Sequence, residues 1–185
     1  MYLKKRYYRI IESTIKKILN FKNTSKSIYL KKTIQSAIYN TSNNKEKILF
    51  LNKDNNRYVV HNNDHISKSL FIDGEFDYKI LKKALKILGK KHKKQTLINI
   101  GAHIGSSCIE AIKMNHFKNS IAFEPAIRNF RLLKVNIFLN ELEDRIKVYN
   151  LAISKKKTNL YLSINKRGNS GDNRILKKRT ICYFC

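Results

Sequence analysis

The stretch of sequence that decides the fold is residues 95–105, which read QTLINIGAHIG. A short apolar run of strand length, 95–100, passes directly into a turn that contains two glycines, 101–105. A helix-like run then continues through Met114. Glycine lets a turn approach a ligand closely, and the first turn of the next helix offers free N–H groups and the positive end of a dipole. This stretch therefore predicts a strand, a ligand-binding turn and a helix.

The same alternation continues along the chain. Residues 120–123 form a second strand candidate, 126–139 a second helix and 145–149 a third strand. Strands that alternate with helices at this spacing are typical of a parallel sheet with crossover helices. We therefore predict an α/β fold built on a Rossmann-like sheet.

An acidic residue ends the second predicted strand. Glu124 follows residues 120–123 and is itself followed by Pro125. In a doubly wound sheet the carboxyl ends of adjacent strands face one crevice, so we expect Glu124 to lie near the glycine turn. A carboxylate there can accept hydrogen bonds from both hydroxyls of a ribose, although an ordinary surface acid is the alternative. The G-x-x-x-G spacing lacks the G-x-G-x-x-G pattern of a dinucleotide site, which favours adenosylmethionine.

Four segments in this order resemble the motifs of the FkbM methyltransferase family, and the resemblance spans residues 75–175. The segments are LINIGAHIG at 97–105, AFEP at 122–125, Asn129-Phe130 with Leu133, Asn136 and Asn140, and VYNLAIS at 148–154. The resemblance implies a class I methyltransferase fold and S-adenosyl-L-methionine as the cofactor. It also implies methylation of a hydroxyl on a sugar-containing or other small metabolite.

The resemblance assigns residues to the cofactor. It implies that the turn at 101–105 cradles the methionine end, that Glu124 holds the ribose, and that residues 150–152 lie near the adenine. It assigns no catalytic residue and no metal ligand. The cofactor-binding residues that we predict are Asn99, Gly101, Ala102, His103, Gly105, Glu124, Pro125, Asn150 and Ala152.

Two positions depart from the family pattern. The family usually has Asp where this chain has Asn99, and Asn where it has His103. Without the carboxylate, the site loses a charge-assisted hydrogen bond to the cofactor's ammonium, a kind of bond typically worth about 1.5–3 kcal/mol. The imidazole of His103 could act as a catalytic base, because its ordinary pKa lies near neutrality, or it could only hydrogen-bond the cofactor or its neighbours.

The resemblance stops near the C-terminus. Residues 158–164 are one more strand candidate, 168–175 read as a polar loop, and 176–185 match no pattern that we recognise. The family's later acidic strand-end motif has no counterpart here. We expect a sheet that is incomplete on its C-terminal side, without an acceptor-binding half, and a tail of aberrant origin such as a shifted reading frame. Half of a parallel sheet would leave apolar surface uncovered.

The N-terminal part has a different character. Residues 2–22 form a basic amphipathic helix, which could lie on an anionic membrane surface or pack against the protein. The apolar runs 48–51 and 57–60 flank a turn at 53–56 and predict a β-hairpin. We divide the chain into a helix-and-hairpin region at 1–72, a methyltransferase domain at 73–175 and a tail at 176–185.

Two smaller features precede the sheet. Asp73 and Gly74 can open a helix with one apolar side, which Gly89 can end. Further upstream, His61 and His65 stand four apart with a carboxylate between them. Their asparagine neighbours favour a loop over the helix that a metal site would need, so we expect no metal there.

The charge of the chain is strongly positive. Lys and Arg number 39 against 13 Asp and Glu, which gives a net charge of +26. Such a field could attract phosphate polymers or anionic membranes, but the lysines are spread along the chain, as a compositional bias would leave them. We therefore expect a small-molecule or glycan hydroxyl acceptor and disfavour a nucleic-acid partner, and we leave the oligomeric state open. The alternatives are an inactive remnant that retains only cofactor binding, and a basic nucleic-acid-binding protein.

The cysteines indicate a reducing compartment. Cys108, Cys182 and Cys185 are too few for a disulfide framework, which fits a cytoplasmic protein. The last two form a single C-x-x-C, and no second pair completes a zinc site. No apolar stretch approaches the length of a membrane span.

Overall fold

The computed structural model describes residues 25–41, 47–52, 54–61, 64–89, 95–155, 161–163 and 170–176. The chain forms two compact units, residues 1–41 and 42–185. In the first unit the structure describes helix α2 (Ser25–Thr41). The basic helix that we predict at 2–22, and residues 177–185 of the tail, lie outside the described residues. Our division into three regions stays a prediction.

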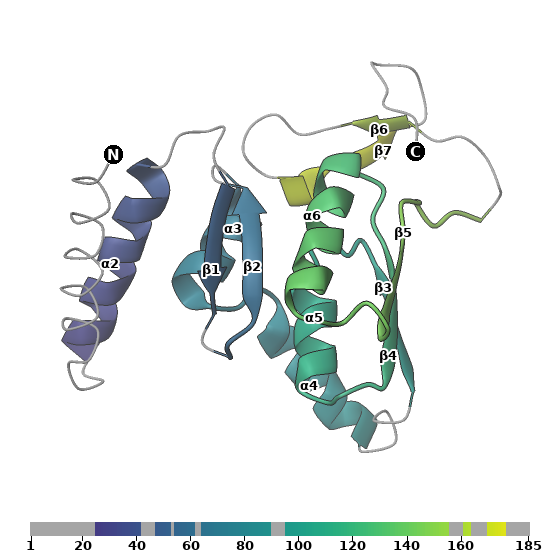
Figure 1. The fold of residues 1–185 in the computed structure, drawn as a ribbon, viewed down its shortest axis with the longest axis horizontal. Coiled ribbons are helices and arrows are strands. Elements are labelled where there is room, and N and C mark those ends of the chain that lie inside the picture. The colour runs from purple at the N-terminus through teal and green to yellow at the C-terminus, as the bar shows by residue number, and fades with distance from the viewer. Residues whose placement is uncertain are drawn as a thin grey trace. The chain divides into compact units, whose positions relative to one another are not determined.

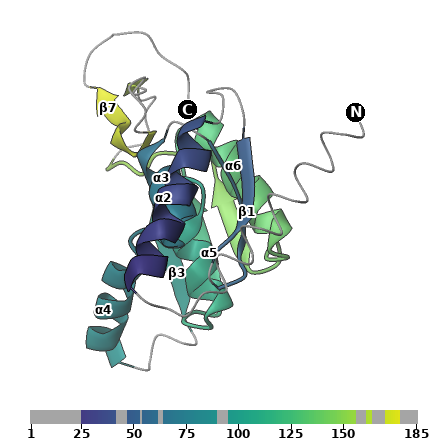
Figure 2. The same ribbon diagram turned by 90° about the vertical axis from the view of Figure 1, so that its left-hand side faces the viewer.

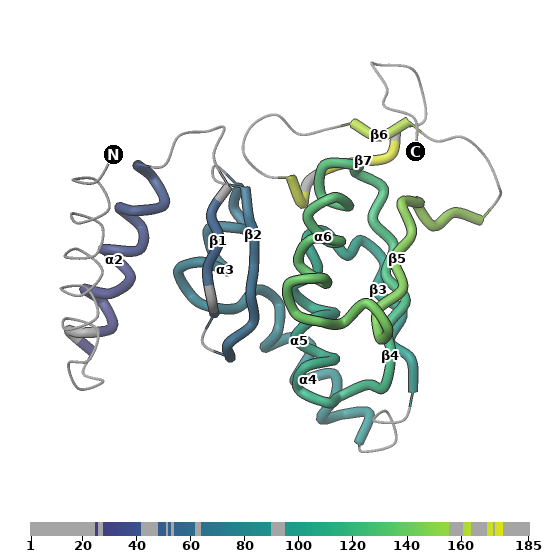
Figure 3. The backbone as a smooth tube through the Cα atoms, viewed as in Figure 1, coloured from purple at the N-terminus to yellow at the C-terminus, as the bar shows by residue number. Residues whose placement is uncertain are grey.

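A parallel sheet forms the centre of the second unit. It consists of β3 (Thr96–Ile100), β4 (Asn119–Phe123) and β5 (Ile146–Tyr149), in that order across the sheet. Helix α5 (Ser106–Lys113) connects β3 to β4, and α6 (Ile127–Leu139) connects β4 to β5 (Figure 1). The tube in Figure 3 follows this path from strand to helix without interruption. The α/β class with crossover helices that the sequence predicts is therefore confirmed.

The two faces of the sheet differ. One face packs on α5 and α6 through a buried cluster that includes Ile109, Ile112 and Leu133. On the other face, Ile98 and Ile100 are each 63% exposed. The described residues thus supply one helical layer where a doubly wound sheet has two, and they leave an apolar surface in solvent.

A β-hairpin precedes the sheet, as predicted. Strands β1 (Lys47–Leu51) and β2 (Arg57–His61) pair antiparallel, and Leu51 lies opposite Arg57. Asn52 shapes the turn, because its Oδ1 accepts the N–H groups of Asp54 at 3.0 Å and of Asn56 at 2.9 Å. Strand β2 lies beside α6 (Figure 1), and in the turned view of Figure 2 the other hairpin strand, β1, is seen next to α6.

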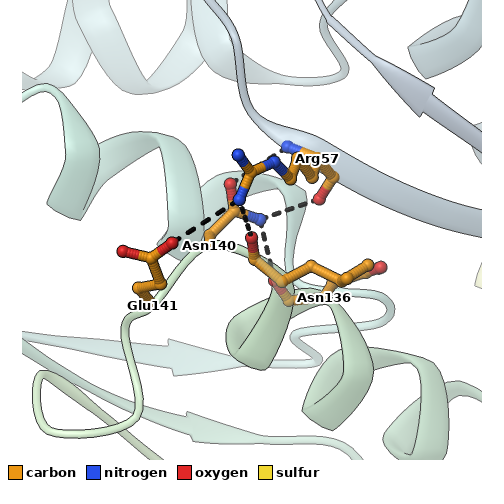
Figure 4. A network of polar contacts seen from close by, with 5 residues as sticks. Arg57, Asn136, Asn140 and Glu141 are labelled. Atoms are coloured by element: carbon orange, nitrogen blue, oxygen red, sulfur yellow. Dashed lines mark hydrogen bonds and ion pairs between the residues drawn. The ribbon is translucent and has the colours of Figure 1, made fainter.

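Asn136 of α6 and Asn140, which caps the end of α6, complete the hydrogen bonding of β2. Figure 4 shows the contacts of Asn140 with Arg57 and Asn136. Asn136 Oδ1 accepts the N–H of Val59 at 2.7 Å, and its Nδ2 donates to the oxygens of Val59 at 3.2 Å and Ile104 at 2.9 Å. One turn later, Asn140 forms the same paired contact with the backbone N–H and oxygen of Arg57, at 3.0 and 2.7 Å. Because Ile104 belongs to the glycine turn, Asn136 ties the hairpin, α6 and the turn together.

The helices before the sheet differ from the prediction. Helix α3 (His65–Asp73) ends where we predicted a helix to begin, because Gly74 has a φ of 74° and its N–H donates to Leu70. The sequence pair at 73–74 is thus a helix end, and α4 (Tyr78–Leu88) begins only after Asp77. Gly89 caps α4 as expected.

The region after β5 also differs in part. Strand β6 (Tyr161–Ser163) lies within the strand predicted at 158–164. The loop predicted at 168–175 is wrong, because the short 3-10 helix η2 (Ser170–Asp172) and strand β7 (Arg174–Leu176) occupy it. Polar residues suggested a loop, but Ile175 pairs with Leu162 of β6 in a small antiparallel sheet. In the described part of the chain, no helix is long and apolar enough to cross a membrane.

We predict that Asn136→Ala lowers the free energy of unfolding by about 3 kcal/mol, because it leaves the buried oxygen of Ile104 and the partly buried N–H and oxygen of Val59 without this partner, and a buried group left unpaired costs about 1–3 kcal/mol. Urea denaturation measures the change. Lys134→Ala on the exposed side of α6 is the control and should change stability by less than about 0.5 kcal/mol. Equal effects of the two substitutions would contradict this role for Asn136.

Candidate functional site

A cavity of about 450 Å³ opens at the carboxyl ends of β3 and β4. Its walls come from four parts of the chain: the α3–α4 region, the turn after β3 with the start of α5, the end of β4, and Leu162 of β6 together with residues in and directly after η2. Five of the predicted site residues line it, namely Gly101, Ala102, His103, Glu124 and Pro125.

The parallel register explains why these residues meet. Ile100 and Phe123, the last residues of β3 and β4, lie opposite each other. The chain then turns back, and the N–H groups of Gly101 and Ala102 both donate to the oxygen of Phe123, each at 2.9 Å. The glycine turn is thereby held against the end of β4, directly beside Glu124.

The Glu124 carboxylate is the centre of this arrangement. Its Oε2 accepts the N–H of His103 at 2.8 Å, and its Oε1 accepts the N–H of Ala126 at 2.9 Å. The residue is only 5% exposed, and this burial raises its pKa despite the opposing hydrogen bonds from the N–H groups of Ala126 and His103. Each carboxylate oxygen has a second lone pair, so the group can accept hydrogen bonds from a ligand as well.

Asn99 does not line the cavity. It lies on β3 with Ala122 opposite it, and its amide is beside the buried thiol of Cys108. Burial raises the pKa of that thiol to about 12, although the neighbouring Asn99 amide opposes this rise. The structure therefore places Asn99 in the packing between β3 and α5.

The remaining predicted residues do not line the cavity. Gly105 begins α5 with a φ of 93°, and a Cβ there would lie 2.7 Å from Leu133 Cδ1, so close packing of α5 on α6 requires glycine. Asn150 donates to the oxygens of Glu124 at 2.8 Å and Pro125 at 3.0 Å, which fixes the loop after β4. Ala152 is half-buried and is not a lining residue.

Hydrogen bonds link three polar side chains at the cavity: His103 and Ser170 line it, and Asp64 contacts Ser170. His103 Nε2 is in hydrogen-bond contact with Ser170 Oγ, and Ser170 Oγ donates to Asp64 Oδ1 at 2.6 Å. The N–H of Ser170 donates to the same oxygen at 2.8 Å. Asp64 also caps α3, because its Oδ2 accepts the N–H and hydroxyl of Ser67 at 2.9 and 2.8 Å.

Asp64 and His103 favour different charge states. Burial alone would raise the pKa of Asp64, but the hydrogen bonds from Ser170 and Ser67 outweigh it and lower the pKa. Burial also lowers the pKa of His103, and the negative charge of Asp64 opposes that effect. The site therefore favours an ionised Asp64 beside a neutral imidazole.

Sequence reasoning missed Asp64 and Ser170 as members of the site. Asp64 was considered only for its place between two histidines. The structure separates those histidines, because His61 Nε2 accepts from Arg128 at 3.0 Å while His65 lines the cavity. Among the described residues no group of three metal-ligating side chains occurs. Ser170 lies in a polar run, and no pattern in the sequence connects it to the glycine turn.

We predict that Gly105→Ala destabilises the chain by about 2–3 kcal/mol, through overpacking against Leu133 and left-handed strain. Gly101→Ala is the matched control. Its φ is also positive, at 77°, but a Cβ there would meet nothing within 4 Å, so the free energy of unfolding should fall by only about 1 kcal/mol. Thermal or urea unfolding measures both, and an equal loss in the two variants would contradict the packing role.

No protein-family model matches the chain, and no curated protein matches it. Three solved structures share part of its fold. The Pyrococcus horikoshii TYW2 protein in complex with MeSAdo is 15% identical, with a TM-score of 0.42 over 70% of this chain and 50% of its own. The M. jannaschii tRNA m1G37 methyltransferase is 18% identical, with a TM-score of 0.41 over 65% of this chain and 34% of its own. The SAM-dependent methyltransferase from Agrobacterium tumefaciens is 13% identical, with a TM-score of 0.41 over 60% and 34%. The chain thus spans half or less of the length of these three proteins.

Proposed function

We propose that this chain is the cofactor-binding part of an S-adenosyl-L-methionine-dependent methyltransferase of the FkbM type. The observation that carries the proposal is the cavity at the carboxyl ends of β3 and β4, where a glycine turn meets the buried Glu124 carboxylate. This is the place where open α/β sheets bind their ligands. The four motifs that resemble the FkbM family include both the turn and the carboxylate.

The residues of the cavity fit this cofactor. Its volume of about 450 Å³ lies within the range of small-molecule sites. Gly101 faces open space, so the backbone can approach a ligand there. Glu124 combines burial with spare lone pairs, which suits the two hydroxyls of a ribose. Ser106 and Ser107 bring the first turn of α5 to the cavity, where free N–H groups suit the carboxylate of a methionine.

The chemistry of the site is mainly positioning. When bound, the cofactor supplies a methyl group on a positively charged sulfur. The chain's own residues would hold the nucleoside through Glu124, exclude water with the walls of the cavity, and align an acceptor with the methyl group. We assign the alignment of the acceptor to Phe76 and Leu162, which line the cavity from outside the parallel sheet. The acceptor that we propose is a hydroxyl of a sugar-containing or other small metabolite, as the FkbM resemblance implies.

We predict that the purified chain binds S-adenosylhomocysteine in isothermal titration calorimetry. An analogue whose ribose lacks both hydroxyls should bind about 10-fold to 100-fold more weakly, since hydrogen bonds to a charged group are worth about 1.5–3 kcal/mol. In Glu124→Gln the difference in affinity between the two ligands should shrink. Glu143→Gln, at an exposed acid, is the control and should keep the wild-type difference in affinity. A difference that persists undiminished in Glu124→Gln would remove the ribose role of Glu124.

The affinity for S-adenosylhomocysteine should also depend on pH through Glu124. The ionised carboxylate accepts the ribose hydroxyls, so binding favours ionisation of a group whose pKa burial has raised. Affinity is then full above this raised pKa and falls by up to about tenfold for each pH unit below it. Titrations at several pH values should show that Glu124→Gln loses this component, and an unchanged pH dependence in the variant would contradict the assignment.

A further inference from the structure

The hydrogen bonds that link His103, Ser170 and Asp64 fix the position of one proton. Asp64 is ionised and can only accept hydrogen bonds. Ser170 has a single hydroxyl proton, which it gives to Asp64 Oδ1 at 2.6 Å. Its oxygen must therefore accept from His103, so the imidazole carries its proton on Nε2.

The other nitrogen of His103 is then a lone-pair acceptor. Nδ1 is buried, and within the described residues no hydrogen-bond partner faces it. The imidazole lines the cavity, in the same turn as Gly101 and Ala102. A buried acceptor without a partner costs free energy, and a donor on a bound ligand would remove that cost.

Once a bound ligand donates a proton to the imidazole, the charge around the ring favours the protonated form. Asp64 reaches it through Ser170 from the start of α3, and Glu124 holds its backbone N–H from the end of β4. Asp77 and His65 also line the cavity, while the described lining residues include no Lys or Arg. Burial keeps the resting imidazole neutral, and the negative charge of Asp64 stabilises the imidazolium after proton transfer.

We propose that His103 is the general base of this site, and that Ser170 and Asp64 are positioning residues that hold its Nε2–H tautomer. The inference rests on the proposed function. In the step, the acceptor's O–H bond breaks and its proton passes to His103 Nδ1. The acceptor oxygen forms a bond to the methyl carbon, and the carbon–sulfur bond breaks with its electron pair left on the neutral sulfur. The imidazolium later returns the proton to solvent.

The first test examines the imidazole without any ligand. NMR of the full chain with ¹⁵N-labelled histidine reports the tautomer and the pKa of His103. We expect the Nε2–H tautomer and a pKa below the ordinary value of 6.5. Ser170→Ala should increase the Nδ1–H population, and Asp64→Asn, which keeps a side chain able to cap α3, should lower the pKa further. An Nδ1–H tautomer in the wild type, or no change in either variant, would overturn the proposed relay.

The second test locates His103 relative to the methyl group that is transferred. Sinefungin carries an amine where S-adenosyl-L-methionine carries its sulfonium methyl, whereas S-adenosylhomocysteine carries neither group. His103→Asn removes the base, and Asn tolerates the left-handed φ of 53° at this position. We expect this variant to bind sinefungin about 10-fold more weakly and S-adenosylhomocysteine as the wild type does.

The outcomes separate the two proposals. An equal loss for both ligands would place His103 on the amino-acid or nucleoside part that they share, and no loss for either would place it away from the ligand. Both results overturn the general-base assignment and leave the cofactor pocket intact. If neither ligand binds the wild-type chain, the proposed function fails, and with it the base role, whereas the NMR result still decides whether the relay exists.

Discussion

The site depends on the two hydrogen bonds that the Glu124 carboxylate accepts from the backbone of His103 and Ala126. One joins the strand end of β4 to the glycine turn after β3, and the other begins α6. A buried carboxylate would be costly without such donors, and two backbone N–H groups of adjoining loops would be unpaired without the carboxylate. The same group therefore builds the pocket and, in the function we propose, binds the ribose.

A second framework of hydrogen bonds carries this arrangement into the rest of the unit. Asn136 links the glycine turn to β2, and Asn150 fixes the loop that follows Glu124. Neither side chain lines the cavity. Residues that hold the backbone in place thus share the sequence motifs with residues that face the ligand, so the four motifs describe one folding unit as well as one site.

The sequence was most informative where local pattern and strand topology agree. The parallel strands, their crossover helices and the meeting of Gly101 with Glu124 follow from periodicity and from the geometry of parallel sheets. The helix boundary at Asp73 and Gly74 could not be placed in this way, because an acidic residue and a glycine suit the start of one helix as well as the end of another.

The contact between His103, Ser170 and Asp64 could not be predicted at all. Asp64 lies 106 residues and His103 lies 67 residues from Ser170 along the chain, and only the tertiary fold brings the three together. Asn99 does not line the cavity, and its predicted cofactor contact stays a prediction. The resemblance assigned it to the cofactor, but the alternation of side chains along β3 turns it toward α5, beside Cys108.

The central claim is that the glycine turn and Glu124 grip a nucleoside together. A crystal structure of the chain with S-adenosylhomocysteine tests it most directly. We predict that both ribose hydroxyls lie within hydrogen-bond distance of the Glu124 carboxylate and that the ligand backs onto Gly101. A ligand bound at another place, or with its ribose turned away from Glu124, would contradict the account.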